Sequence, residues 1–328
     1  MFADPTKILE LMYAYKTSEA LFAANELDVF TLLNKKPLRG EEIANKLNTV
    51  PRATIVLLDF LVTIGLLNRE KGRYSNTSIS EKFLVRGSSG YLGDLIRFER
   101  HLDTKITTTN LLKGIKGEVE ELQAGIDPEI DEIYMKAMDS IAGYSSMFLA
   151  RLAKLEGKKK LLDLGGGPGT FAITFCKINP MIKAIVFDFP GIVEIAKKNI
   201  AKHRMEQNID VLGGDFTKDD IGKDYDCVIL SNVMHFFNPE QNKNTVKKAY
   251  EALNNGGVFI LHDFFLEDEE KTKPFVVAEL TIDWLTMGLV FNFSRKEITE
   301  MFKEIGFTEV IFKRLPYLPT SAVIGKKE

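Results

Sequence analysis

The stretch Asp163-Leu-Gly-Gly-Gly-Pro-Gly-Thr170 decides the fold, because it joins a short apolar strand to the start of a helix. Glycines permit such a tight turn and let a ligand approach the backbone without obstruction by a Cβ atom. A dinucleotide fingerprint that begins at Gly165 needs glycine at position 170, where the chain has threonine, and no Gly-Lys-Ser/Thr sequence completes a phosphate-binding loop. The loop therefore predicts a ligand site at a strand end, and it disfavours both of those nucleotide motifs.

Around this loop, short apolar runs alternate with segments long enough for helices. The runs are Leu161–Leu164, Ala184–Phe187, Ile209–Leu212, Cys227–Leu230 and Val258–Leu261. Such alternation is typical of a doubly wound, mostly parallel sheet. A further helix that ends before Gly306 should lead to a final pair of strands, near Glu309–Lys313 and Ala322–Gly325. We therefore predict an α/β fold with a seven-stranded, mostly parallel sheet.

Residues 1–90 have a different pattern, in which helices precede a small hairpin. Arg39–Leu47 and Pro51–Gly65 have the spacing of two helices, and Leu66–Ser75 has that of two short strands, so the unit resembles a winged helix. A DNA-reading helix needs Arg, Lys, Asn or Gln side chains, and the second helix offers only Arg52. The pattern thus favours a dimerisation module over DNA binding.

These patterns divide the chain into three predicted parts. They are a winged-helix-like dimerisation domain at 1–90, a helical linker and pocket cover at 91–155, and a ligand-binding domain at 156–328.

Composition excludes several classes of partner. The chain has 328 residues and balances 43 Lys and Arg against 46 Asp and Glu, so its net charge of −3 gives no general attraction to nucleic acid or to an anionic membrane. The two cysteines, Cys176 and Cys227, lie in apolar stretches and predict neither a disulfide framework nor a cysteine-rich zinc site. The N-terminus lacks the basic and apolar regions of an export signal, so we expect a cytoplasmic protein.

Polar residues follow two further strands of the predicted sheet. Asp188, in Val186-Phe-Asp-Phe-Pro190, ends the second strand, where a carboxylate can accept hydrogen bonds from both hydroxyls of a ribose. Asp215 and Phe216 end the third, where they can meet an adenine amino group and the ring itself. Each acid alone is equally consistent with a solvated loop. Because the carboxyl ends of parallel strands meet at one edge, the three strand ends together predict a nucleoside site.

The glycine pattern resembles the first motif of class I S-adenosylmethionine-dependent methyltransferases. Together with Phe-Asp-Phe-Pro, Gly-Gly-Asp-Phe and Met-His-Phe-Phe-Asn-Pro-Glu in chain order, it makes the whole chain similar to the dimeric small-molecule O-methyltransferases, the caffeate and hydroxyindole type. The resemblance implies S-adenosyl-L-methionine as the cofactor and a homodimer formed through the N-terminal domain. The cofactor-binding residues it implies are Asp163, Gly165, Gly167, Asp188, Phe189, Asp215, Phe216 and Ser231.

His235 corresponds to the general base of that family, four residues after the strand that ends at Ser231. Methyl transfer to a phenol requires removal of the hydroxyl proton, and an imidazole can take it at neutral pH. The usual alternative for a lone histidine among apolar neighbours is a structural role in the core, but its place at a strand end favours catalysis.

Asp263 ends the fifth strand, where the family has an acidic partner to the histidine. His262 should point to the opposite face, because successive side chains of a strand alternate. That alternation disfavours a metal site made of His235, His262 and Asp263, so we expect no metal.

Two positions depart from the family pattern, and the acceptor stays open. Asn292 is the nearest match to a glutamate that relatives have before the last helix, and Ser231 stands where plant members have a lysine. Aromatic residues near the predicted site suit a flat aromatic acceptor as well as they suit an ordinary core; they are Phe236, Phe237, Phe264, Trp284, Phe291 and Phe293. The alternatives are a carbon or nitrogen methyltransferase and a winged-helix regulator that senses S-adenosylmethionine.

Overall fold

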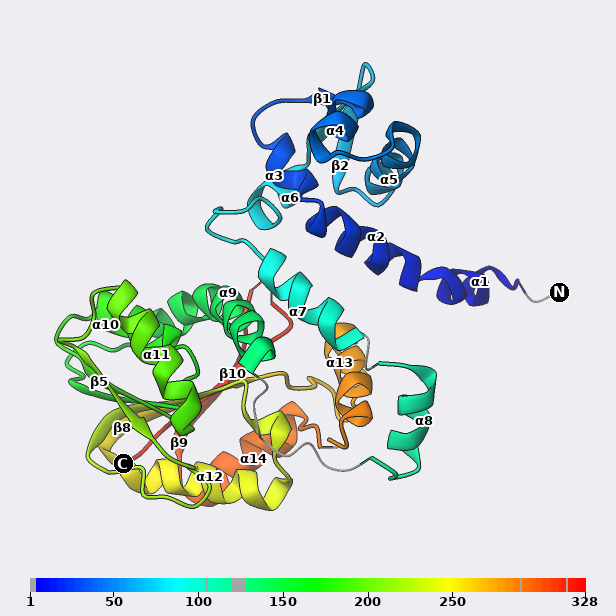
Figure 1. Ribbon diagram of the computed structural model, residues 1–328. Helices are drawn as coiled ribbons and strands as arrows, with labels where there is room; N and C mark the ends of the chain where they lie inside the picture. The colour runs from blue at the N-terminus through cyan, green and yellow to red at the C-terminus, as the bar shows by residue number, and fades with distance from the viewer. Residues whose placement is uncertain (1–3, 104–105, 120–127, 290, 317) are drawn as a thin grey trace. The chain divides into compact units, whose positions relative to one another are not determined.

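The computed structural model describes residues 4–103, 106–119, 128–289, 291–316 and 318–328 (Figure 1). Contacts group the chain into two compact units. One contains residues 1–103 and 132–140, and the other contains residues 104–131 and 141–328. The segment predicted as a linker, 91–155, therefore contributes to both units, and the predicted boundaries at 90 and 155 stay predictions.

The first unit combines helices with a small antiparallel sheet. Its helices are α1 (Thr6–Tyr13), α2 (Tyr15–Glu26), α3 (Val29–Leu33), α4 (Gly40–Leu47), α5 (Pro51–Thr63), α6 (Ser78–Phe83) and α7 (Gly93–Asp103). The sheet has the order β1-β3-β2, formed by Leu38–Arg39, Arg73–Asn76 and Leu67–Glu70. The two helices and the hairpin predicted for this part are thus present in the predicted order. Leu58 and Leu61 of α5 are fully buried against the core of the unit, as expected for a packing helix.

The second unit is built on a seven-stranded sheet of order β6-β5-β4-β7-β8-β10-β9. Its strands are β4 (Lys160–Leu164), β5 (Lys183–Asp188), β6 (Ile209–Gly213), β7 (Tyr225–Ser231), β8 (Leu253–Asp263), β9 (Thr308–Arg314) and β10 (Ser321–Lys326). The first five run parallel, and β10 pairs antiparallel with both β8 and β9. The predicted seven-stranded, mostly parallel sheet is confirmed.

Helices cover both faces of this sheet (Figure 1). Side chains of α9 (Pro128–Leu152), α10 (Thr170–Ile178) and α11 (Pro190–Lys202) share one buried cluster with one face of the strands. Side chains of α12 (Pro239–Ala252) and α14 (Arg295–Ile305) share a second cluster with the other face. The remaining helices of the unit are α8 (Thr108–Ile115), α13 (Phe275–Thr286) and the 3-10 turn η1 (Met234–Phe236).

The order of the strands places the ligand site. The chain moves outward from β4 to β5 and β6, and then returns to the other side of β4 with β7. The carboxyl ends of β4 and β7 therefore form the switch point of the sheet, and open parallel sheets bind ligands in the crevice at such a point. The glycine loop follows β4, and the turn with His235 follows β7.

Candidate active site

The glycine loop adopts the backbone that its sequence requires. Gly165 and Gly167 have positive φ values of 64° and 53°, which favour glycine over any residue with a Cβ atom. The Gly165 N–H donates to the carbonyl of Phe187 at 2.8 Å, so the loop is tied to the end of β5. A Cβ added at Gly165 would lie 2.9 Å from Cγ2 of Val233, which shows how closely the loops after β4 and β7 approach each other.

Asp188 at the end of β5 links two loops of the site. Its Oδ2 accepts a hydrogen bond from the N–H of Gly167 at 2.8 Å, and its Oδ1 accepts one from the N–H of Phe189 at 2.7 Å. Burial raises the pKa of this carboxyl, while the hydrogen bonds from Gly167 and Phe189 act in the opposite direction. Asp188 and Phe189 therefore lie beside the glycine loop, as the predicted cofactor set requires.

Asp163 lies beneath the glycine loop and is fully buried. Its Oδ2 accepts a hydrogen bond from the N–H of Ala172 in the first turn of α10 at 3.0 Å, whereas its Oδ1 has no partner among the described residues. Burial raises the pKa of this carboxyl to about 7, and the nearby charge of Asp188 adds to the rise. The side chain thus anchors the helix that follows the loop and retains one unsatisfied acceptor.

Asp215 and Phe216 follow β6 in different environments. The Oδ1 of Asp215 accepts hydrogen bonds from the N–H and the hydroxyl of Thr217, and its Oδ2 lies 2.9 Å from Nζ of Lys218. The Phe216 ring is buried and packs edge-on against Phe237, with 5.6 Å between ring centroids. A Cβ added at Gly165 would lie 3.6 Å from Cε1 of Phe216, so this ring lies beside the glycine loop. The Asp215 carboxylate already has protein partners, and its predicted contact with adenine stays a prediction.

His235 and Asp263 meet at the carboxyl ends of β7 and β8. Nδ1 of His235 lies 2.8 Å from Oδ1 of Asp263, and that oxygen also accepts from the N–H of Phe264 at 2.8 Å. Oδ2 accepts from the N–H groups of Val233 and Met234 at 3.0 and 2.8 Å. Burial alone would raise the pKa of Asp263, but the charge of His235 and these hydrogen bonds outweigh burial and lower it. Asp263 is therefore an ionised carboxylate with four donors.

Aromatic rings enclose the imidazole of His235, whose side chain is 11% exposed. Trp284 of α13 stacks on it, with 4.8 Å between centroids and 5° between planes. Phe236 and Phe264 lie at 4.2 and 6.1 Å. Three of the six aromatic residues predicted to border the site thus surround the histidine directly. Phe237 and Phe293 instead pack with the core beneath α12 and α14, and Phe291 is exposed.

Ser231 and His262 form a separate polar pair on the other face of the sheet. The Ser231 hydroxyl lies 2.8 Å from Nδ1 of His262, a fully buried ring 5.9 Å from Phe171. Burial lowers the pKa of His262 to about 4, so this imidazole is neutral at physiological pH. His262 and Asp263 do point to opposite faces, and the predicted contact of Ser231 with the cofactor stays a prediction.

A cavity of about 210 Å³ adjoins the aromatic cluster. It is lined by Thr281, Ile282, Trp284, Leu285, Leu289, Phe291 and Asn292. The amide nitrogen of Asn292 is buried and has no partner among the described residues. Trp284 lines this cavity and also stacks on His235, so its indole ring is shared by the cavity and the histidine.

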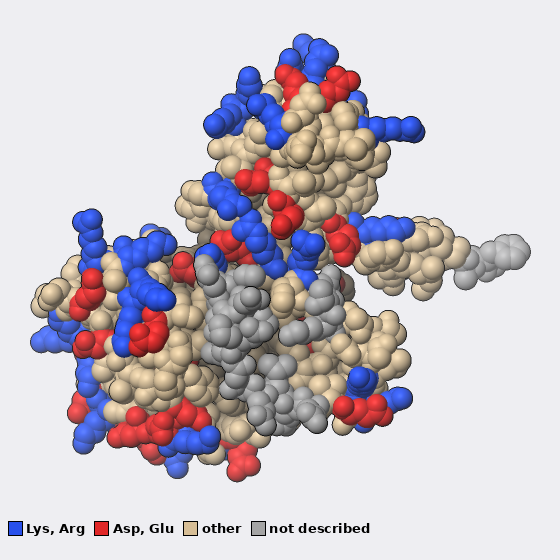
Figure 2. All heavy atoms as spheres, in the orientation of Figure 1, with Lys and Arg blue, Asp and Glu red and all other residues tan. Residues whose placement is uncertain are grey.

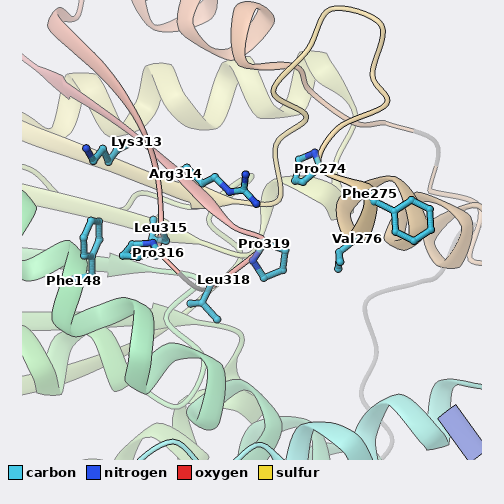
Figure 3. Close-up of a pocket in the computed structure, with 10 residues that line it drawn as sticks. All are labelled: Phe148, Pro274, Phe275, Val276, Lys313, Arg314, Leu315, Pro316, Leu318 and Pro319. Atoms are coloured by element: carbon cyan, nitrogen blue, oxygen red, sulfur yellow. The ribbon is translucent and has the colours of Figure 1, made fainter. Parts of the chain in front are cut away.

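A larger open hollow of about 880 Å³ lies elsewhere on the same unit (Figure 3). Its lining comes from Phe148, the start of α13, the end of β9 and the proline-containing loop after β9. None of these residues belongs to the strand ends described above, so the hollow is distinct from the crevice.

Three contributing residues escaped prediction from the sequence. Asn242 of α12 donates hydrogen bonds to the carbonyls of Met234 and Phe237, at 2.9 Å each. Lys248 of the same helix donates to the carbonyl of Phe216 at 2.7 Å, and Val233 packs against the glycine loop. One signal in the sequence could have pointed to α12. Asn238 and Gln241 form a capping box, which fixes the start of this helix directly after the turn that carries His235.

Comparisons with known proteins agree with this geometry. A family model described as the O-methyltransferase domain matches residues 105–308, and one described as the O-methyltransferase dimerisation domain matches residues 9–86. The tetracenomycin polyketide synthesis 8-O-methyl transferase of Streptomyces glaucescens is 28% identical, over 98% of this chain and 97% of that protein. A putative O-methyltransferase structure from Nostoc punctiforme has a TM-score of 0.88 at 26% identity, over 100% of both chains. Human N-acetylserotonin methyltransferase, solved in complex with S-adenosylmethionine, has a TM-score of 0.84 at 23% identity, over 99% and 98% of the chains.

The chain therefore belongs to the O-methyltransferase family and is an S-adenosylmethionine-dependent enzyme with the class I fold. The residues present fit that cofactor. Gly165 and Gly167 expose backbone without Cβ atoms, Asp163 has a buried acceptor with no partner among the described residues, and Asp188 ends the adjacent strand.

In the described part of the chain, no group of three or more His, Cys, Asp or Glu residues is arranged to hold a metal ion. None of the helices described there has the length and apolar character of a membrane span. Basic and acidic side chains are interspersed on the face shown in Figure 2, where a nucleic-acid surface would gather one sign of charge.

The two buried carboxyls predict opposite dependences of stability on pH. An unfolded aspartate titrates near 4, so between about pH 4 and 7 the folded chain retains the proton of Asp163 that the unfolded chain releases, and stability falls as pH rises. Asp163→Asn keeps an acceptor for Ala172 and removes this loss. The free energy of unfolding, measured in urea, should fall less from pH 5 to pH 8 in this variant than in the unmodified protein.

Asp263→Asn is the control of opposite sign. The lowered pKa of Asp263 contributes stability above about pH 4 that is lost as pH falls through its folded value. The free energy of unfolding of Asp263→Asn should therefore fall furthest below that of the unmodified protein near pH 7, and the difference should shrink below pH 4. Equal pH slopes for all three proteins would contradict both assignments.

Proposed function

We propose that this enzyme methylates a hydroxyl group of a small aromatic acceptor, with His235 as the general base and Asp263 as the residue that orients it. The observation that carries the proposal is the hydrogen bond of 2.8 Å between Nδ1 of His235 and the buried carboxylate of Asp263. The pair stands at the carboxyl ends of two neighbouring parallel strands. Val233, whose N–H donates to Asp263, packs against the glycine loop.

The contact with Asp263 sets the tautomer of the base. An ionised carboxylate only accepts hydrogen bonds, so Nδ1 of His235 carries a proton and donates it. In the neutral imidazole the lone pair is then on Nε2, which accepts the hydroxyl proton as the acceptor oxygen attacks. Asp263 also stabilises the positive charge that the ring acquires, and the stacked Trp284 adds a favourable cation–π interaction.

The cofactor would be held by the loops after β4, β5 and β6. We assign Gly165 and Gly167 to close backbone approach, Asp188 to the ribose hydroxyls, and Asp215 with Phe216 to the adenine. When bound, S-adenosylmethionine supplies an electrophilic methyl group. This chain's own contribution is to align the acceptor oxygen with that group and to exclude water from the site.

An aromatic acceptor is supported by the walls of the site. Rings of Phe236, Phe264 and Trp284 surround the base, and the adjoining cavity of about 210 Å³ is lined mainly by apolar side chains. Flat rings pack well against such walls, and few polar groups compete for the hydroxyl. The relative from Streptomyces glaucescens, named for tetracenomycin polyketide synthesis, is consistent with an acceptor of this kind.

The matched dimerisation domain supports a homodimer formed through the first unit. Helix α1 buries none of its described residues and exposes Ile8, Leu11, Met12 and Tyr13 by more than half. Large apolar side chains gathered on an exposed helix mark an interaction surface. A second copy of the chain is the partner that the family match favours.

Isothermal titration with S-adenosylhomocysteine tests cofactor binding, and NMR of the product tests the acceptor atom. We expect tight binding and a product that carries an O-methyl group. A product methylated on carbon or nitrogen would refute the acceptor assignment while leaving the cofactor site intact.

His235→Ala should lower kcat by about 10² to 10⁴, because the acceptor hydroxyl loses its general base. The affinity for S-adenosylhomocysteine should stay unchanged. His203→Ala is the matched control, since that histidine contacts Lys177 on the protein surface, away from the strand ends. Turnover of a phenolic acceptor by His235→Ala at the rate of the unmodified enzyme would show that another group is the base.

The double variant Leu11→Glu, Met12→Glu should convert the dimer to a monomer, because it places two charges on the apolar surface of α1. Sedimentation velocity measures the change. Lys7→Gln on the same helix serves as the control and should leave the dimer intact. A dimer that persists in the double variant excludes α1 from the interface.

A further inference from the structure

We propose that Asn242 is a positioning residue for methyl transfer, which fixes the turn that carries His235 at the catalytic edge of the sheet. The proposal rests on the proposed role of His235 as the general base. The hydrogen bonds of the Asn242 amide go to the backbone of the turn, at the carbonyls of Met234 and Phe237, so Asn242 acts through that backbone.

The turn is too short to hold itself. Met234–Phe236 form a single 3-10 turn, which has poor internal hydrogen-bond geometry. It follows Asn232, whose positive φ of 55° reverses the chain at the end of β7. The conformation of His235 therefore depends on contacts from outside the turn.

Asn242 provides such contacts on one side. Its Nδ2 donates to the carbonyl of Met234 and to the carbonyl of Phe237, at 2.9 Å each, so that both hydrogens of one amide bridge the two ends of the turn. The side chain is 1% exposed, and water cannot easily replace either bond. Asn242 is itself fixed, because its N–H donates to the carbonyl of Asn238 in the cap of α12.

Asp263 holds the same turn from the other side. Its carboxylate accepts from the N–H of Met234, while the carbonyl of Met234 accepts from Asn242. The residue directly before His235 is thus held between an acceptor on β8 and a donor on α12. Asp263 sets the orientation of the ring, and Asn242 sets the place of the backbone from which the ring extends.

Helix α12 is also hydrogen-bonded to the segment that contains Phe216, a predicted contact of the cofactor. Lys248, six residues after Asn242, donates to the carbonyls of Phe216 and Asp219 at 2.7 and 2.9 Å. One rigid helix is therefore hydrogen-bonded to the turn with the base and to the segment with Phe216. We infer that α12 sets the distance between the base and the cofactor site, with Asn242 as its contact on the side of the base.

Removing the amide should slow the chemical step and spare cofactor binding. Misplacement of a reacting group by about 1 Å can cost about 10² in rate, so we expect Asn242→Ala to lower kcat by about 10². The dissociation constant of S-adenosylhomocysteine should stay within about threefold of its original value. Asn242→Asp should lose at least as much, because its carboxylate donates no hydrogen bond at neutral pH and faces two carbonyl oxygens.

Thr245→Val is the matched control on the same helix. Thr245 is buried like Asn242, but its hydroxyl donates to Gln241 within α12, so kcat should be unchanged. If Asn242→Ala does not fold, as judged by its thermal unfolding, Asn242→Ser serves in its place. Its hydroxyl keeps one donor, and we expect an intermediate loss of kcat.

A double-mutant cycle separates positioning from general structural damage. If Asn242 acts through His235, adding Asn242→Ala to His235→Ala should change the residual rate by less than about threefold. A second loss of about 10² in that background would overturn the proposal, as would turnover of Asn242→Ala within about twofold of the unmodified enzyme. Full activity of His235→Ala alone would instead refute the assignment of His235 as the base. This outcome differs from a second loss of rate in the double variant, which would refute only the role of Asn242.

Discussion

A buried carboxylate must be met by donors, and Asp263 satisfies this requirement in a way that builds the site. Its side chain is 2% exposed and accepts hydrogen bonds from the backbone of Val233, Met234 and Phe264 and from Nδ1 of His235. An isolated charge in that position would be very costly, so the loop after β7 is drawn onto the end of β8. The same four bonds that make the buried charge tolerable also fix the tautomer and the orientation of His235. Stability and the geometry of the proposed base therefore depend on one side chain, at the point where two parallel strands end.

A comparison with Asp163 shows that burial alone does not give an aspartate the role of Asp263, which is to hold the loop after β7 at the strand end. Asp163 is as deeply buried as Asp263, but among the described residues its carboxylate has one hydrogen-bond donor, and its pKa rises to about 7. Asp263 has four hydrogen-bond donors, and its pKa falls. The difference comes from the backbone around each carboxyl. The N–H groups of Gly165 and Gly167 donate to Phe187 and Asp188, and Oδ1 of Asp163 has no partner among the described residues. The turn after β7 instead directs its N–H groups onto Asp263.

Elements that depend on local pattern could be predicted from the sequence. Apolar runs such as Cys227–Leu230 and Val258–Leu261 identified strands of the parallel sheet, and the carboxyl ends of those strands correctly brought His235 together with Asp263. Alternation along β8 also predicted that His262 faces away from Asp263, and His262 pairs there with Ser231.

The sequence pattern could not supply the connection of the site to α12. Asn242 and Lys248 look like ordinary polar positions of an amphipathic helix, and their partners, the carbonyls of Met234 and Phe216, are backbone atoms that no residue type reveals. For Asp215 the residue type alone suggested a contact with adenine. In the structure its carboxylate contacts its neighbours Thr217 and Lys218.

Closure of the site over the base depends on packing that is distant in sequence. Trp284 covers the imidazole of His235, and the next residue of α13, Leu285, packs directly against α8. A Cβ added at Gly114 of α8 would lie 2.2 Å from the carbonyl oxygen of Leu285, so only glycine permits this close approach of the two helices. Any larger side chain there would move α13 outward, and Trp284 would move with it. Water could then reach His235, where it would compete with the acceptor hydroxyl for Nε2 and weaken the electrostatic interaction with Asp263. With His235 as the proposed base, α8 and α13 control the acceptor side of the active site, and α12 holds the histidine turn on the side of the proposed cofactor contact Phe216.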